Sequence, residues 1–109
     1  MGIKQTPEIS YLYVVEFDQG TIKVGYTGGP ETRIRSYVFQ ANKFRINVLR
    51  HWVSEPHVTA FLFEATLLQW CADRAKEVHG REWFTGLTFE EVKAAAISII
   101  ATDGLAPIT

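Results

Sequence analysis

The sequence predicts an α+β domain in which a small three-stranded antiparallel sheet is flanked by helices, in the order β-β-α-β-α-α. Two runs rich in β-branched and aromatic residues, 11–17 and 21–26, are separated by a short loop with a glycine, which is typical of a hairpin. A third, alternating run covers 45–53, and the segments around these runs carry helix start signals and helical apolar spacing. Paired strands with helices packed against them belong to the α+β class.

The loop Asp18-Gln19-Gly20 sets the register of the hairpin. Gly20 stands at the left-handed position of a three-residue turn, so Phe17 is expected to pair with Thr21. Because side chains alternate between the faces of a strand, the hairpin has one apolar face that predicts the core and one unusual polar and aromatic face. The core face is Leu12, Val14, Ile22 and Val24, and the other face is Tyr11, Tyr13, Lys23 and Gly25, with Tyr13 opposite Gly25 and Val15 opposite Lys23.

Pro30 is suited to the first turn of a helix, which is expected to run to about Gln40. On this helix Arg33, Tyr37 and Gln40 share one face at the i, i+4, i+7 spacing, and apolar residues form a separate stripe. The stripe is Ile34, Val38 and Ala41. The strand at 45–53 follows.

A long helix is expected from Ser54-Glu55-Pro56 through Val78, closed by His79-Gly80. Thr88 and Glu91 then form a capping box for a last helix to about Ala101. One face of this helix is apolar, with Ile97 off it, and it could cover an open core or form a homodimer contact. That face consists of Phe89, Val92, Ala96, Ile99 and Ile100. The tail at 102–109 is expected to fray.

Length and composition indicate one globular domain over 1–109, with its core at about 11–101. Apolar residues make up 47% of the 109 residues and charged residues 21%, which excludes a disordered chain. The single Cys71 excludes an internal disulfide and fits a reducing compartment. No apolar run reaches the roughly 18 residues of a membrane span, and residues 1–4 lead into no apolar segment typical of a signal peptide. The sequence therefore predicts a cytoplasmic protein with no membrane partner.

Charge is distributed unevenly along the chain, although the net charge is only −1. Residues 1–51 carry seven Lys or Arg against four Asp or Glu, and residues 52–109 carry four against eight. The basic half also holds Tyr11, Tyr13 and Arg33, which form part of the motif pattern described next. A local surface that binds nucleic acid is therefore compatible with the low net charge.

Five short segments occur in an order and spacing that a structural role does not explain. They are Tyr11-Leu12-Tyr13, Lys23-Val24-Gly25, Arg33 in the helix that follows, Glu64 within an apolar helical run, and Arg81-Glu82-Trp83-Phe84. This set resembles the GIY-YIG nuclease family, in particular its short single-domain phage and bacterial branch, over roughly residues 11–84. The chain departs from that family in having Lys23 at the second-motif tyrosine, and Tyr26 where a basic residue or histidine is frequent.

The resemblance implies a metal-dependent endonuclease that hydrolyses DNA phosphodiester bonds with low intrinsic sequence specificity; RNA is not excluded. Tyr13 would be the general base, Lys23 a cation that lowers its pKa, Arg33 the phosphate ligand and Glu64 the ligand of one Mg²⁺ or Mn²⁺. An unpaired carboxylate in the apolar surroundings of Glu64 would otherwise cost several kcal/mol. The expected substrate-binding residues are Tyr11, Gly25, Tyr26, Tyr37 and Arg35.

Two other functions remain open from the sequence. One is a catalytically inactive module of the same fold that binds nucleic acid or a partner protein, and the other is an unrelated α+β interaction protein. Tight DNA binding would need a homodimer or a DNA-targeting partner protein, because no separate DNA-binding module is present. His57 lies seven residues before Glu64, on a similar helical face, and its role stays open. The three tryptophans, Trp52, Trp70 and Trp83, are expected in the core rather than as base-stacking platforms.

Overall fold

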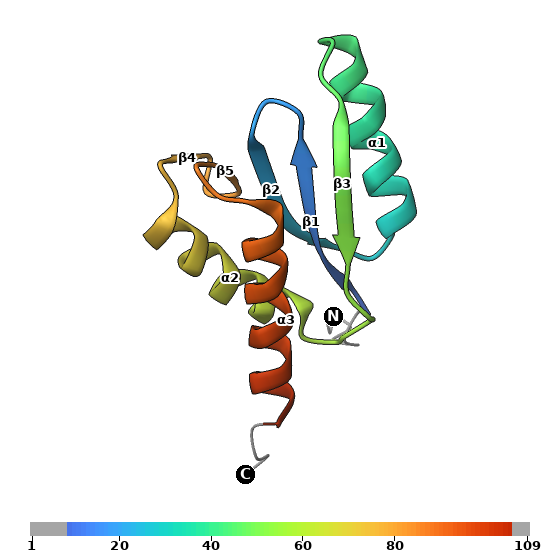
Figure 1. The fold of residues 1–109 in the computed structure, drawn as a ribbon. Helices are drawn as coiled ribbons and strands as arrows, with labels where there is room; N and C mark the ends of the chain where they lie inside the picture. The colour runs from blue at the N-terminus through green and yellow to red at the C-terminus, as the bar shows by residue number, and fades with distance from the viewer. Residues whose placement is uncertain (1–8, 106–109) are drawn as a thin grey trace, which may run out of the picture.

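The computed structural model describes residues 9–105, with side chains up to residue 102. The sequence-based expectations for residues 1–8 and 106–109 lie outside this range. A five-stranded antiparallel sheet forms the middle of the molecule and three helices cover it (Figure 1). The elements are β1 (Tyr11–Phe17), β2 (Thr21–Thr27), α1 (Pro30–Lys43), β3 (Val48–Val53), α2 (Ala60–Arg74), β4 (Glu77–His79), β5 (Trp83–Thr85) and α3 (Phe89–Leu105).

The strand order β3-β1-β2-β5-β4 corrects the predicted three-stranded sheet. The predicted long helix is also wrong at its end, because α2 stops at Arg74 and Ala75 is already extended, with φ −70° and ψ 153°. The chain then forms the β4–β5 hairpin, and β5 pairs with β2. The strands β4 and β5 have three residues each, which is too short to show an alternating pattern. The pairing of β5 with β2, some 60 positions earlier, also leaves no signal in the local sequence. The α+β class itself is as predicted.

The β1–β2 hairpin has the predicted register. Tyr13 pairs with Gly25 and Val15 pairs with Lys23. Gly20 has φ +81°, the left-handed conformation that the turn requires.

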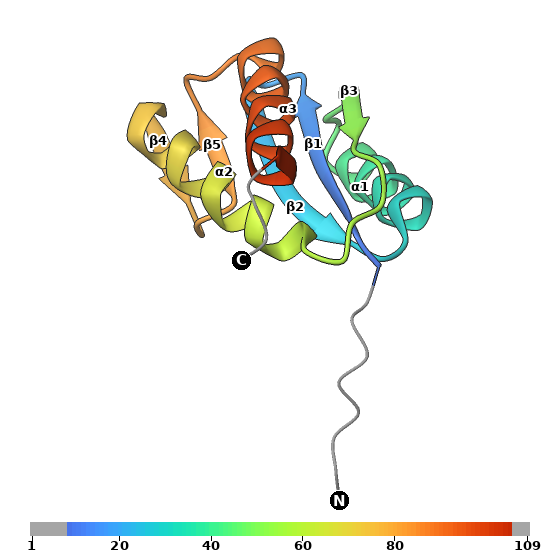
Figure 2. The same cartoon turned by 90° about the horizontal axis from the view of Figure 1, so that it is seen from below.

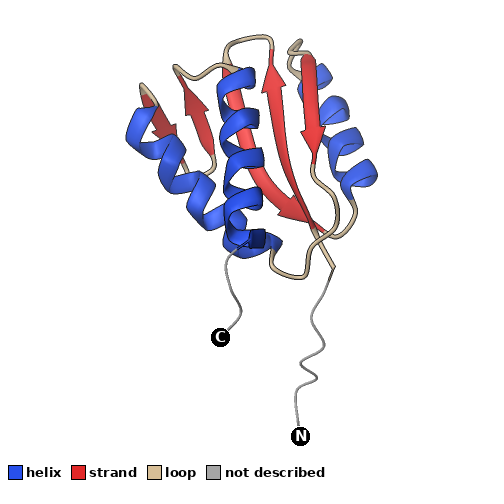
Figure 3. Cartoon of the chain, turned by 60° about the horizontal axis from the view of Figure 1, so that its bottom comes forward, coloured by secondary structure: helices blue, strands red, loops and turns tan. Residues whose placement is uncertain are grey.

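Both faces of the sheet are buried, which gives three layers (Figures 2 and 3). The predicted core face, including Leu12 and Val24, packs against α2 and α3. The opposite face was not predicted as a core, yet Tyr13 is fully buried there against side chains of α1. A second apolar layer on this face is the reason that a tyrosine and a lysine of the hairpin lose contact with water.

Several helix ends differ from the predicted ones. The helix α1 continues to Lys43 and ends at a turn in which Arg45 has φ 62°, so β3 begins only at Val48. The helix α2 begins at Ala60 because the segment before it forms an isolated bridge between Ser10 and His57.

The helix α3 covers the larger core. Three of its predicted apolar residues are buried, Ile99 and Ile100 pack partly against the core, and Ile97 is exposed, as its position off the apolar face predicts. The apolar face is thus occupied within the chain. Among residues 9–105, no helix is both long and apolar enough to cross a membrane.

The predicted capping box at α3 is confirmed, and it gives a stability prediction. The Thr88 amide donates to the Glu91 carboxylate (2.7 Å), and the Glu91 amide donates to the Thr88 hydroxyl (3.1 Å). Thr88→Ala is expected to lower the free energy of unfolding in urea by about 1 kcal/mol. Thr66→Ala is the control, because Thr66 only donates back to the Leu62 carbonyl inside α2 and should be neutral or slightly stabilising. Equal urea midpoints for Thr88→Ala and the wild type would show that the cap contributes nothing.

Candidate functional site

The candidate site lies at the edge of β2 that β5 leaves uncovered. Strand β5 pairs with the segment Thr21 to Lys23, and the Val24 amide still donates to the Glu82 carbonyl just before β5. Among residues 9–105, β2 therefore has no strand neighbour on that side from Gly25 onward. Gly25 lies in this uncovered part, directly opposite Tyr13. We call the cluster around this position the β2-edge site, and it consists of Tyr13, Lys23, Arg33, Tyr37, Glu64 and Glu82.

Gly25 provides the space that the Tyr13 ring occupies. A Cβ added to Gly25 would collide with the Tyr13 hydroxyl oxygen and lie 2.6 Å from ring atom Cζ. The ring itself is fully buried and cannot move aside at low cost. The glycine therefore fixes the position of the phenol against the backbone of β2.

Two phenols and a guanidinium form the first half of the site. The hydroxyl oxygens of Tyr13 and Tyr37 lie 2.7 Å apart in a hydrogen bond in which either can be the donor. Arg33, one turn before Tyr37 on α1, is exposed, and the neighbouring phenols of Tyr37 and Tyr13 raise the pKa of its guanidinium. A cation beside two neutral oxygens at the surface keeps donors free for an anion.

The pKa of Tyr13 was expected to be lowered, but the structure raises it. Burial raises the pKa of the Tyr13 phenol well above its ordinary value, and the hydrogen bond from Tyr37 raises it further. Arg33 is the cation that lowers it, and Lys23 does not act in this way. The role expected for Lys23 as the group that acidifies Tyr13 is therefore not supported.

Lys23 is a buried, fully paired cation. Its ammonium donates to the Val24 carbonyl (2.9 Å) and to the Glu82 carboxylate, with which it forms an ion pair. It also lies 5.7 Å from the centroid of the Tyr13 ring and 5.6 Å from that of Trp83. Because the Val24 amide also donates to the Glu82 carbonyl (3.0 Å), Glu82 holds this part of β2 through both its backbone and its side chain.

Glu64 brings α2 to the same edge of the sheet. Its side chain is half-buried, and its pKa is raised first by burial and then by the charge of Glu82. Lys23 and Arg81 act in the opposite direction. These three charged groups lie on β2 and directly before β5, so the charges that act on Glu64 are those of this edge, although α2 covers the other face of the sheet.

The two carboxylates are suited to a divalent cation, although they do not form a complete cage. Within the part of the chain that the structure describes, no three His, Cys, Asp or Glu side chains gather as metal ligands. Glu64 and Glu82 nevertheless repel each other, as the raised pKa of Glu64 reflects. Mg²⁺ is commonly held by one or two carboxylates together with waters and substrate phosphates, and such an ion would offset the repulsion.

Three of the expected substrate-binding residues lie outside this cluster. Tyr26 is exposed and packs against Phe61 of α2, with ring centroids 6.5 Å apart, on the face opposite to Tyr13. Arg35 is exposed on α1 but only two residues from Arg33, so the two do not face the same way. Tyr11 is half-buried at the start of β1.

His57 also lies away from the cluster. Its ring packs edge-on against Phe63 at 5.1 Å, and its backbone is bridged to Ser10. Tyr37 and Gly25, by contrast, belong to the β2-edge site.

Sequence reasoning missed Glu82 as a member of the site. The signal was present in Arg81-Glu82-Trp83-Phe84, but the pairing of β5 with β2 had to be known before Glu82 could be matched to Lys23. The turn before Glu82 is unusual, since Gly80 and Arg81 both have positive φ, 58° and 74°. A non-glycine residue in this conformation is uncommon and occurs preferentially at functional positions.

Comparison with known proteins gives a family. The family model of the T5orf172 domain matches residues 9–100, nearly the whole chain, and the chain therefore belongs to the T5orf172 domain family. This family is often linked to nucleases and DNA-binding proteins. No curated protein matches the chain significantly. No solved structure does so either.

The family match corrects the resemblance drawn from the sequence. The assignment to the GIY-YIG family was wrong, because the matching model is that of the T5orf172 domain. The motif pattern also gave no indication of the Lys23–Glu82 ion pair or of strands β4 and β5.

Proposed function

We propose that this T5orf172 domain is a metal-dependent endonuclease that hydrolyses phosphodiester bonds in DNA. The observation that supports it most is the position of Lys23 between two groups of residues. Its ammonium lies 5.7 Å from the centroid of the Tyr13 ring, beside Tyr37 and Arg33, and its charge also acts on the half-buried Glu64 carboxylate. Hydrolysis of a phosphodiester needs an anion-binding group, a proton acceptor for the attacking water and stabilisation of the leaving oxygen, and these residues can supply each.

Arg33 binds the phosphate in this proposal. Its guanidinium is exposed and lies beside the two phenols, so it is accessible to a phosphoryl oxygen of a bound strand. Its two parallel N–H groups match two phosphate oxygens. The Lys23–Glu82 pair stays behind it as a fixed support of β2.

Tyr13 accepts the proton of the attacking water, and Tyr37 receives the proton that Tyr13 releases. Because burial raises the pKa of Tyr13, a free phenolate at this position is unfavourable. Transfer along the 2.7 Å hydrogen bond avoids it: the proton of the water moves to the Tyr13 oxygen, while the Tyr13 proton moves to Tyr37. Tyr37 is half-exposed and passes its own proton to solvent.

Glu64 would hold the divalent ion, with Glu82 beside it. Bound there, Mg²⁺ or Mn²⁺ supplies Lewis-acid stabilisation of charge on the phosphoryl and leaving 3′ oxygens. The products would be a 5′-phosphate and a 3′-hydroxyl. One site cuts one strand.

The second candidate is a nucleic-acid-binding module without turnover. Two observations favour it: Lys23 is already neutralised by Glu82, and the pKa of Tyr13 is raised rather than lowered. Such a module would bind DNA through Arg33 and leave the strand intact.

Nicking of a supercoiled plasmid tests the proposal. The wild type is expected to nick with Mg²⁺ or Mn²⁺ and to stop when the ion is chelated. Arg33→Lys should slow nicking by roughly ten- to a hundredfold, since a lysine loses the planar pair of donors. Arg35→Lys, on the same helix but outside the site, should nick within about twofold of the wild type. DNA binding without nicking in either ion would favour the binding module, and equal rates for both variants would remove Arg33 from the mechanism.

A further inference from the structure

We propose that the aromatic pocket between α1 and the sheet binds one unstacked nucleobase of the strand whose phosphate lies at Arg33. The preferred substrate is therefore single-stranded or locally unpaired DNA. This inference rests on the proposed function and names its substrate class.

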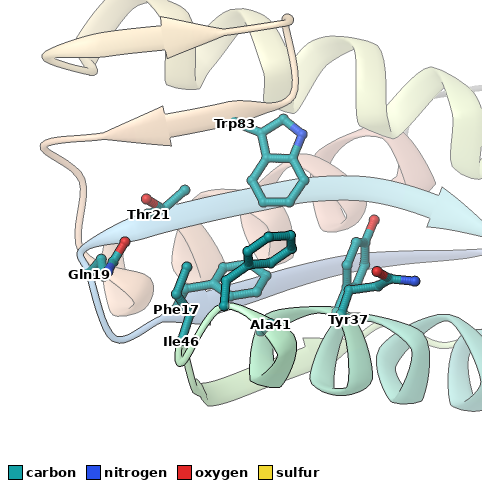
Figure 4. A pocket seen from close by; sticks show the side chains of 9 residues that line it. Phe17, Gln19, Thr21, Tyr37, Ala41, Ile46 and Trp83 are labelled. Carbon is teal, nitrogen blue, oxygen red and sulfur yellow. The ribbon is translucent and has the colours of Figure 1, made fainter.

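The pocket has a volume of about 340 Å³. Its walls include Phe17 of β1, Tyr37 of α1 and Trp83 of β5, and Figure 4 shows Tyr37 and Trp83 approaching the same space from opposite sides. The ring centroids of Phe17 and Trp83 lie 5.6 Å apart, and those of Tyr37 and Trp83 lie 6.1 Å apart in an edge-on arrangement. A mostly apolar pocket of this size is at the lower end of the range for small-molecule sites.

The rim of the pocket is polar and accessible. Gln19 from the β1–β2 loop and Gln40 from α1 are both exposed and line the pocket, so their amides can pair with the donor and acceptor edge of a base. Phe44 lines it as well and is 73% exposed, so its ring is accessible to a ligand.

Tyr37 joins the pocket to the β2-edge site. Its ring lines the pocket, while its hydroxyl group is bonded to Tyr13 at the phosphate cluster. A base and its own phosphate are separated only by the sugar, so a nucleotide that places its phosphate at Arg33 has its base within reach of this pocket. A base that is stacked and paired in a duplex cannot enter, which is why an unpaired strand is favoured.

Aromatic walls with amides at the rim fit a nucleobase better than an aliphatic ligand. Bases stack on aromatic side chains whatever their identity, and the resulting binding energy is largely independent of sequence. A strand held in this way gains affinity without a separate DNA-binding module.

The test compares two single strands of about 12 nucleotides, one with all its bases and one with abasic sugars throughout, which keeps the phosphates. Affinity is measured by fluorescence anisotropy with the Glu64→Gln protein, so that no strand is cut. The strand with bases is expected to bind about ten- to a hundredfold more tightly than the abasic strand. It should also bind more tightly than the same strand in a blunt duplex.

Trp83→Leu should remove most of this difference, whereas Trp70→Leu should preserve it, because Trp70 lies on α2 with Arg74 stacked on it. If Trp83→Leu fails to fold, the double variant Gln40→Ala with Phe44→Ala replaces it, since both side chains are exposed and their loss does not disturb a core. Equal affinity for the two strands, or no binding of either, would overturn the pocket proposal. If the wild type nicks DNA but the strands with and without bases bind equally well, the pocket proposal fails and the nuclease proposal holds. If binding depends on the bases but the wild type does not nick, the nuclease proposal fails and the pocket proposal holds.

Discussion

Glu64→Gln is expected to reduce plasmid nicking by roughly 10³-fold or more while leaving the protein folded. Glutamine keeps the shape of the side chain and removes its charge, so the divalent ion loses its ligand and the leaving oxygen its stabilisation. Nicking rates at saturating Mn²⁺, measured with a far-UV circular dichroism spectrum of each protein, check this. Glu55→Gln is the control, because Glu55 is an exposed carboxylate outside the site.

Although Glu64→Gln should reduce nicking, it should stabilise the metal-free fold. A loss of activity can then be distinguished from a loss of folding. Burial and Glu82 raise the pKa of Glu64, so the folded chain binds this proton more tightly than the unfolded chain does. The ionised carboxylate therefore costs stability above its folded pKa, and this cost disappears as the pH falls through that pKa. Without metal, Glu64→Gln should unfold at a higher temperature than the wild type near about pH 8 and lose the advantage near about pH 4.

Added Mn²⁺ should reverse that order. The ion binds the folded wild type and raises its unfolding temperature, but it should leave Glu64→Gln unchanged. If the variant nicks at the wild-type rate, or if Mn²⁺ stabilises both proteins equally, Glu64 is not the metal ligand.

Gly25→Ala is expected to lower nicking by roughly 10²-fold or more, at least as much as Tyr13→Phe does, and to destabilise the fold by about 1–3 kcal/mol. The added Cβ collides with the Tyr13 phenol, and the buried ring can escape only by moving away from Tyr37 and Arg33. Urea unfolding gives the stability change, and nicking rates well below the unfolding midpoint give the loss of function in folded protein.

Gly28→Ala is the matched control, three residues further along. There the nearest atom to a new Cβ is the Ile9 carbonyl oxygen at 3.7 Å, an ordinary contact, so both stability and nicking should stay close to the wild type. If Gly25→Ala is as stable and active as Gly28→Ala, the close packing of the phenol on β2 has no functional importance.

The hairpin shows what a sequence can determine. The turn glycine and the alternation of side chains fix the pairing of Tyr13 with Gly25, because both act within a few residues. The capping box of α3 is local in the same sense. The β4–β5 hairpin could not be predicted, since its strands are three residues long and are stabilised by pairing with β2, far away in the sequence.

The candidate site was predictable only where its residues are close together in the sequence. Arg33 and Tyr37 are one helical turn apart, so their shared face follows from spacing alone. The partner of Lys23 could not be predicted, because Glu82 reaches it only through the pairing of β5. The direction of the Tyr13 pKa shift was missed because it depends on burial by α1, and a second core on that face has no signature in the hairpin itself.

In the proposed mechanism Tyr37 would take part in proton transfer through its hydroxyl group and in base binding through its ring, so one side chain would link strand binding to cleavage. A substitution that shifts α1 would therefore be expected to change the cleavage rate and the affinity for the strand together. Engineering a different strand preference should therefore begin at the outer rim, at Gln19 or Phe44, which line the pocket and are not members of the β2-edge site.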